Sequence, residues 1–265
     1  MPRLSLDSLT LTDTAPPVAI RAAAEAGFDA CSLWIISPAL YPSPLVTPQN
    51  ERECAAAIAE SGIEVIALEV FDLHSMAGVE AARPLLEMGA RLGGKAVLAI
   101  NYSNPDRGET AEILAAFAEA AAGFGLATNL EPVAGGKSET LSEAVDLIRA
   151  SGADVGLCFD PHHLIRAGGG LADLQAVDPA LIRYVQVCDG AIPQPAELAR
   201  TEAVCERLYP GDGHFPLIDL LRATPRDVTI GIECPSVSRA HSGVAPLDQA
   251  REALAKLKKL LALVD

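Results

Sequence analysis

The segment V-G-L-C-F-D-P-H-H, residues Val155–His163, reads as a buried β-strand that ends in a polar loop. Large apolar residues alternate in it with small or polar ones, so the two kinds occupy opposite faces of the strand. A strand with one bulky face and one small face suits a closed barrel, where the outer face packs on helices and the inner face meets a crowded axis. The outer set is Val155, Leu157 and Phe159, and the inner set is Gly156, Cys158 and Asp160.

Strand-like segments recur eight times along the chain, separated by Ala-rich amphipathic segments. Strict alternation of this kind predicts βαβ units and a parallel sheet. The 265 residues are close to the ~250 typical of a (β/α)₈ TIM barrel, so we expect one closed barrel, a single α/β domain over residues 1–265. The expected strands are Leu4–Ser8, Ala30–Ile36, Glu64–Phe71, Lys95–Asn101, Leu126–Glu131, Asp154–Asp160, Ile182–Cys188 and Val228–Cys234.

The segments between the strands carry helix start and stop signals. Gly27 and Gly62 each follow an apolar-periodic segment, and Ser138 is a plausible N-cap. The longest irregular stretch, Asp189–Phe215, follows the seventh strand and is expected to cover the barrel mouth. The expected helices include Pro16–Ala26, Thr47–Ser61, Ser138–Ala150 and Pro246–Ala262.

Composition narrows the classes of partner and compartment. The net charge of −15 opposes binding to nucleic acid, because that affinity comes mainly from Lys and Arg on phosphates. The six cysteines form no C-x-x-C pair, and the N-terminus carries no secretory apolar segment. No apolar run approaches the ~20 residues that span a bilayer. We therefore expect a cytoplasmic protein with free thiols and neither a membrane nor a nucleic-acid partner.

Four oxygen-bearing side chains share the inward face at the ends of strands five to eight: Glu131, Asp160, Gln186 and Glu233. Barrel active sites form at these strand ends, and neighbouring strands lie only ~4.8 Å apart. Three converging carboxylates repel one another and lose hydration, and a divalent cation removes that penalty. An all-oxygen set suits Mn²⁺ or Mg²⁺ better than Zn²⁺ or Co²⁺, so the sequence predicts one divalent-metal site.

Each of these residues also has a structural interpretation on its own. Asp160 precedes a proline and could cap the next turn, Gln186 could be a satisfied core amide, and Glu131 or Glu233 could pair with a basic residue. Their matching register favours the metal site. We expect His163 to be a ligand or, preferably, a hydrogen-bonding partner of a ligand or the substrate.

Three further residues end strands two, three and four, and the same alternation is expected to turn them inward as substrate-binding candidates: Trp34, Glu69 and Asn101. Trp34 could form a wall against an apolar sugar face or be an ordinary core tryptophan. Glu69 could contact substrate or form an ion pair at the strand end.

A basic residue and a Gly-rich turn, Arg207 and Pro210–Gly213, are expected over the mouth. There the guanidinium could hold a substrate carboxylate or phosphate bidentately, or it could pair with Glu202 or Glu206 on a helix. His162 is expected to be solvated, and His74 is the best outside candidate for a substrate contact.

Five short segments at or just after the later strand ends form a recognisable set: N-L-E-P (Asn129–Pro132), F-D-P-H-H-L-I-R-A-G-G (Phe159–Gly169), V-Q-V-C-D (Val185–Asp189), Y-P-G-D-G-H-F-P-L (Tyr209–Leu217) and G-I-E-C-P (Gly231–Pro235). As a set they resemble the xylose isomerase-like TIM-barrel superfamily of sugar isomerases, epimerases and related lyases, over almost the whole chain. The resemblance implies a divalent metal on Glu131, Asp160, Gln186 and Glu233, with both glutamates also transferring protons.

This resemblance implies an isomerase or epimerase of a sugar, ketose or polyol-derived substrate that works through an enediolate. Sugar epimerases of the group usually carry His at the position of Gln186 and a further Glu soon after Glu131. Gln here is similar to bacterial 3-dehydroshikimate dehydratases, whose D-x-x-H and R-x-x-P-G-x-G segments match Asp160–His163 and Arg207–Gly213. A metal-dependent dehydratase with His163 as its acid or base is therefore the alternative.

Two other functional classes stay open. One is a sugar-binding barrel without turnover. The other is an apurinic endonuclease, which the acidic balance and only five histidines disfavour, because those enzymes build a His-rich site with several zinc ions. The superfamily implies a homo-dimer or tetramer, and the chain lacks a nucleotide-binding fingerprint.

Overall fold

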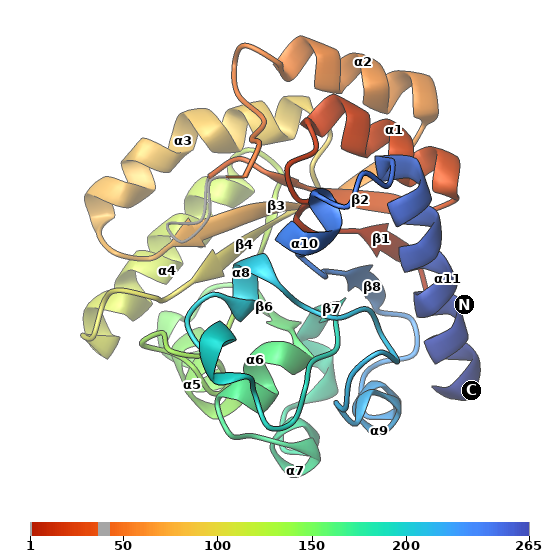
Figure 1. The fold of residues 1–265 in the computed structure, drawn as a ribbon. Helices are drawn as coiled ribbons and strands as arrows, with labels where there is room; N and C mark the ends of the chain where they lie inside the picture. Colours follow the sequence, from red (N-terminus) through yellow and green to blue (C-terminus); the bar gives the residue numbers. More distant parts are fainter. Residues whose placement is uncertain (1, 37–42, 265) are drawn as a thin grey trace.

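The computed structural model describes residues 2–36 and 43–264, and it shows eight parallel strands closed into a barrel (Figure 1). Every strand pairs in parallel with its neighbours in the chain, and β1 also pairs with β8. The expected (β/α)₈ architecture is confirmed. The strands are β1 Leu4–Leu6, β2 Ala30–Trp34, β3 Glu64–Asp72, β4 Ala96–Ile100, β5 Ala127–Glu131, β6 Val155–Phe159, β7 Ile182–Val187 and β8 Thr229–Ile232.

The helices form a ring outside the strands (Figure 1). No helix in the described part of the chain is long and apolar enough to cross a membrane. The α-helices are α1 Pro16–Ala26, α2 Glu51–Ser61, α3 Met76–Arg91, α4 Arg107–Ala122, α5 Leu141–Ser151, α6 Pro161–Arg166, α7 Leu171–Gln175, α8 Glu202–Cys205, α9 Leu217–Arg222, α10 Val237–Ala240 and α11 Pro246–Val264, and the 3₁₀ turns are η1 Ser8–Leu11, η2 Pro179–Leu181 and η3 Ala196–Leu198.

The start of α5 corrects one expectation. Its N-cap is Thr140, whose hydroxyl accepts from the backbone of Glu143 while the Glu143 carboxylate accepts from the backbone of Thr140. This reciprocal capping box satisfies two helix N–H groups. Ser138 is not the cap, because its hydroxyl accepts a hydrogen bond from the Asn101 amide. Similarly, α2 begins at Glu51 rather than at Thr47.

Two hydrophobic clusters separate the inside of the barrel from the outside. The outer cluster joins strands to helices and contains Val155, Leu157 and Phe159, while Cys158 lies in a small inner cluster. The predicted inward and outward faces of β6 are therefore confirmed. Ala67, Leu98 and Tyr184 complete the buried inner cluster with Cys158.

The long segment after β7 lies over the carboxyl ends of the strands, as expected. Three backbone N–H groups, those of Gly190, Gly211 and Phe215, donate to the Asp189 carboxylate and shape this segment into a compact loop. Arg166 of α6 binds Glu202 of α8 through two hydrogen bonds of 2.7 Å. These contacts hold the segment against the helix that follows the sixth strand.

Candidate active site

Three buried acids meet at the mouth of the barrel, at the ends of β5, β6 and β8: Glu131, Asp160 and Glu233, here called the acid cluster. Arg207 Nη1 lies 2.7 Å from Asp160 Oδ2 and 3.2 Å from Glu233 Oε2. His163 Nε2 lies 3.8 Å from Glu131 Oε1 and 4.0 Å from Asp160 Oδ2. The structure thus brings together three of the four predicted metal ligands around the Arg207 guanidinium and the His163 imidazole.

Asp160 combines a capping role with its place in the acid cluster. Its Oδ1 accepts from the backbone N–H of His162 at 2.7 Å, and Pro161 occupies the first position of α6. The structural interpretation of Asp160 as a helix cap is therefore confirmed. Because capping uses Oδ1, the other oxygen, Oδ2, faces Arg207 and His163.

Electrostatics in the cluster are unfavourable without a further cation. Burial raises the pKa of Glu131 well above its usual value, and the neighbouring charges of Glu233 and Asp160 add to the effect. Burial also raises the pKa of Glu233 to about 7, although Arg207 partly offsets the shift. Glu131 Oε1 has no hydrogen-bond partner among the described residues. One guanidinium cannot balance three buried carboxylates, so this donor set fits a divalent cation.

Gln186, the fourth predicted ligand, points inward from β7 and is buried. Its Nε2 donates to Asp7 Oδ2 at 3.1 Å, and its Oε1 accepts from the Cys158 thiol at 3.2 Å. The interpretation as a satisfied core amide is thus confirmed. It does not exclude metal binding, because a carbonyl oxygen has two lone pairs and the thiol occupies only one.

Asp7 was not among the residues predicted from the sequence. It follows β1 and is fully buried, with a pKa that burial raises to about 6. The pattern L-S-L-D over Leu4–Asp7 has the same strand alternation as the later strands and places Ser5 and Asp7 on the inward face. That signal was available in the sequence.

His163 presents a proton, rather than a lone pair, to the acid cluster. Burial lowers its pKa to about 4, although the Asp160 charge partly offsets the shift, so the ring is neutral near pH 7. The backbone N–H of Ala134 donates to its Nδ1 at 3.2 Å, so the proton of the neutral ring is on Nε2. A protonated nitrogen cannot bind a metal ion. The geometry therefore favours His163 as a hydrogen-bond donor over His163 as a ligand.

Arg207 reaches down from the long segment after β7 and is only 2% exposed. Its Nε also donates to the Ala203 carbonyl at 2.8 Å. The alternative expectation, a pair with Glu202 or Glu206, is wrong because both acids have other partners. Glu202 binds Arg166, and Glu206 accepts hydrogen bonds from Ser236 and Ser238.

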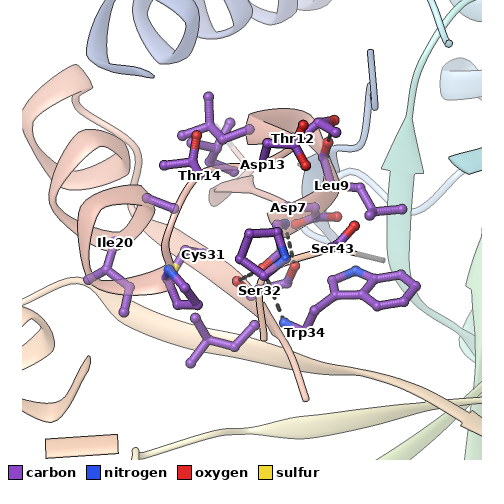
Figure 2. Close-up of a pocket in the computed structure, with 17 residues that line it drawn as sticks. Asp7, Leu9, Thr12, Asp13, Thr14, Ile20, Cys31, Ser32, Trp34 and Ser43 are labelled. Atoms are coloured by element: carbon purple, nitrogen blue, oxygen red, sulfur yellow. Dashed lines mark hydrogen bonds between the residues drawn. The ribbon is translucent and has the colours of Figure 1, made fainter. Parts of the chain in front are cut away.

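Trp34 and Glu69 stand side by side on β2 and β3, where their Cα atoms are register partners. Both are buried, and neither Trp34 Nε1 nor Glu69 Oε1 has a hydrogen-bond partner within the described ranges. Figure 2 shows Trp34 at the edge of a cavity of about 20 Å³ that Asp7 and Ser32 also line. Burial raises the pKa of Glu69, which lies near enough to the acid cluster for the charges of Glu233 and Glu131 to add to the shift, whereas no acid-cluster residue lines the cavity beside Trp34.

Asn101 is a correction. Leu98 belongs to the inner cluster and Val97 to the outer one, so Asn101 has the alternation of the outer face. Its Nδ2 donates to Ser138 Oγ at 3.1 Å, and its Oδ1 accepts from the Asn104 backbone at 3.2 Å. Asn101 therefore joins the loops after β4 and β5 instead of turning into the barrel.

Two other histidines lie outside the acid cluster. His162 is buried rather than solvated, because its ring packs edge-on against His163 with centroids 5.0 Å apart. His74 Nδ1 donates to the Asp72 carbonyl oxygen at 3.0 Å, and the ring lines an apolar cavity with Phe71 and Phe117. Both phenylalanines belong to the outer hydrophobic cluster, so this cavity lies outside the barrel wall.

Comparisons with known proteins agree with this fold. A family profile described as xylose isomerase-like TIM barrel matches residues 20–260. A search of curated proteins gave no significant match. An IolI protein with a bound zinc atom is 18% identical, with a TM-score of 0.76 over 99% of this chain and 98% of that one.

Two other solved structures have the same fold. An L-ribulose 3-epimerase is 19% identical, with a TM-score of 0.75 over 100% of this chain and 96% of that one. A xylose isomerase-like TIM barrel/4-hydroxyphenylpyruvate dioxygenase fusion protein is 19% identical, with a TM-score of 0.82 over 99% of this chain. This chain spans only 43% of that fusion protein. At these identities the three structures establish a shared fold and nothing finer.

Proposed function

The chain belongs to the xylose isomerase-like TIM-barrel family, and from this premise we propose that it is a divalent-metal-dependent isomerase or epimerase of a sugar, ketose or polyol-derived substrate. The observation that carries the proposal is the acid cluster, in which three buried carboxylates face a single guanidinium. An epimerase and a zinc-bound protein share the fold, which supports both parts of the proposal.

The residues proposed to hold the ion are Glu131, Asp160 through Oδ2, Gln186 through Oε1, and Glu233. Their oxygens suit Mn²⁺ or Mg²⁺ best, with Co²⁺ or Zn²⁺ as alternatives. When bound, such an ion supplies a Lewis acid that polarises a substrate carbonyl and makes the adjacent C–H more acidic. His163 remains outside this set because its Nε2 carries a proton.

Glu131 and Glu233 are the proposed proton-transfer groups. Glu131 ends β5 and Glu233 directly follows β8, so they can approach a bound carbon from different sides. One carboxylate accepts a proton from the substrate carbon, and the other returns a proton to the opposite face or to the neighbouring carbon. His163 Nε2–H donates to a substrate oxygen, and Trp34 Nε1–H and Glu69 offer further polar contacts.

A metal-dependent dehydratase of the 3-dehydroshikimate type is the second candidate. It is favoured by the proton on His163 Nε2, which faces the acid cluster. If a hydroxyl lies β to the deprotonated carbon, the glutamate that took the carbon's proton can pass it to the departing oxygen as water is lost, while His163 Nε2–H donates a hydrogen bond to that oxygen.

Incubation of the Mn²⁺-loaded protein in D₂O with ketoses, inososes and 3-dehydroshikimate tests these candidates. Deuterium at a substrate carbon supports the isomerase or epimerase, and protocatechuate absorbance supports the dehydratase. Thermal stabilisation by a sugar with no C–H exchange would instead identify a binding protein without turnover. Glu131→Gln is the matched control, because it keeps the side-chain shape but cannot accept the proton.

A further inference from the structure

A layer of hydrogen-bonded side chains lies inside the barrel, at and below the level of the acid cluster. Tyr184 Oη and Ser5 Oγ donate to Asp7 Oδ1 at 2.5 and 2.8 Å, and Gln186 Nε2 donates to Asp7 Oδ2 at 3.1 Å. The Cys158 thiol donates to Gln186 Oε1 at 3.2 Å. All five side chains are buried, so each contact is shielded from water.

The partners of Gln186 determine which way its amide group is turned. Asp7 accepts two O–H groups at Oδ1 and the Gln186 N–H at Oδ2, so its carboxylate acts as an acceptor at both oxygens. The reversed amide would place the Gln186 oxygen against that carboxylate oxygen, where the two would repel. Cys158, on the other side, supplies a donor to the amide oxygen.

Strand β8 leaves space for this arrangement. A Cβ atom on Gly231 would lie 2.2 Å from Asp7 Oδ2 and 2.3 Å from Tyr184 Oη, so residue 231 has no room for a side chain while this pair is in place. Asp7 is thus held between β7 and β8, with its Oδ2 atom 3.1 Å from Gln186 Nε2.

We propose that Asp7 is a positioning residue that keeps the Gln186 amide oxygen turned toward the metal site. This inference rests on the proposed metal-dependent function. An amide NH₂ group has no lone pair for a cation, so only the orientation that Asp7 selects allows Gln186 to bind the ion. Asp7 itself acts through Gln186, whose amide nitrogen it contacts at 3.1 Å.

Titration of the full-length protein with Mn²⁺, followed by electron paramagnetic resonance of the free ion, tests the proposal. Asp7→Asn places an NH₂ group where the carboxylate was and favours the reversed amide. We expect the Kd for Mn²⁺ to rise by about tenfold to hundredfold, as for other partners that orient metal ligands. In a Gln186→Ala background the same substitution should leave the Kd unchanged.

Tyr184→Phe is the matched control, because it removes another hydrogen bond to Asp7 without touching Gln186. We expect its Kd to stay within about threefold of the parent value even where its melting temperature falls. Circular dichroism identifies folded variants, and Asp7→Ala, which removes the acceptor without adding a donor, replaces Asp7→Asn if the latter does not fold.

Three results would overturn the inference. If the unsubstituted protein does not bind Mn²⁺, the proposed function fails and this inference fails with it. If it binds Mn²⁺ and Asp7→Asn binds equally well, only the inference fails. If Asp7→Asn weakens binding by the same factor in the Gln186→Ala background, Asp7 acts through the fold and not through the amide.

Discussion

Raising the pH should destabilise the metal-free protein above about pH 6.5. A carboxyl group whose pKa is higher in the folded protein than in the unfolded chain retains a proton that the unfolded chain has released. Its contribution to stability is therefore present at low pH and is lost as the pH rises through the folded-state pKa. Burial raises the pKa values of Glu131 and Glu69 well above 4.5, and that of Glu233 to about 7.

The magnitude follows from the number of retained protons. Each proton held only by the folded state lowers the free energy of unfolding by about 1.4 kcal/mol per pH unit. The acids repel one another, so we count one retained proton in a window that opens at about pH 6.5. The loss is about 1.4 kcal/mol for each pH unit until that acid ionises in the folded protein. Burial lowers the pKa values of His162 and His163 below 6.5, so both are neutral in the folded protein. The unfolded chain still releases histidine protons just above pH 6.5, which opposes the slope there, so the slope is measured at the upper end of the window.

Urea unfolding in EDTA at several pH values measures this slope. With saturating Mn²⁺ the acids are ionised in the folded protein, so we expect the slope to disappear. At the upper pH the loaded protein should then be more stable than the metal-free protein. The reasoning is refuted if the metal-free protein keeps constant stability, or gains stability, across this window. Glu53 is exposed on the surface of α2, so Glu53→Gln is the control and should leave the slope unchanged.

Three further predictions concern single side chains. His163→Asn should lower kcat by about 10²–10⁴ while changing the Kd for Mn²⁺ less than about threefold, and a large loss of metal affinity would identify His163 as a ligand instead. Arg207→Met should lower the free energy of unfolding of the metal-free protein by about 3–5 kcal/mol, because Asp160 and Glu233 lose their partner. The same substitution should tighten Mn²⁺ binding, and a calorimetric titration that shows weaker binding would contradict this. Gly231→Ala should cost about 1–3 kcal/mol in urea unfolding because its Cβ meets Asp7, and unchanged stability would show that the space is not needed.

The barrel could be predicted from the sequence because its signals are local and repeated. Alternation of residues places Glu131 and Asp160 on the inward face whatever the rest of the chain does. All eight expected strands are present, with ends that differ by one or two residues. Seven are shorter than expected, because pairing stops before the apolar alternation does, and β3 extends one residue further. The convergence of acids followed from the same alternation, because parallel strands end at one edge.

The remaining features depend on contacts between distant segments. Asn101 stands one residue beyond β4 on the outer face of the alternation, and hydrogen bonds to Ser138 and Asn104 hold it between the loops. The cap of α5 is an exception, because the Thr140–Glu143 capping box is a local pattern that the sequence already displays. Arg207 lies over the mouth as expected, but its pairing with Asp160 and Glu233 depends on how a long loop folds back, and no local pattern encodes that path.

The central claim is that a single divalent cation lets three acids share the mouth of this barrel. Anomalous diffraction from crystals soaked in Mn²⁺ tests it most directly. We predict one anomalous peak, bound by oxygens of Glu131, Asp160, Gln186 and Glu233, with His163 outside the coordination sphere. The absence of a peak there, or a peak held by other residues, would contradict the claim.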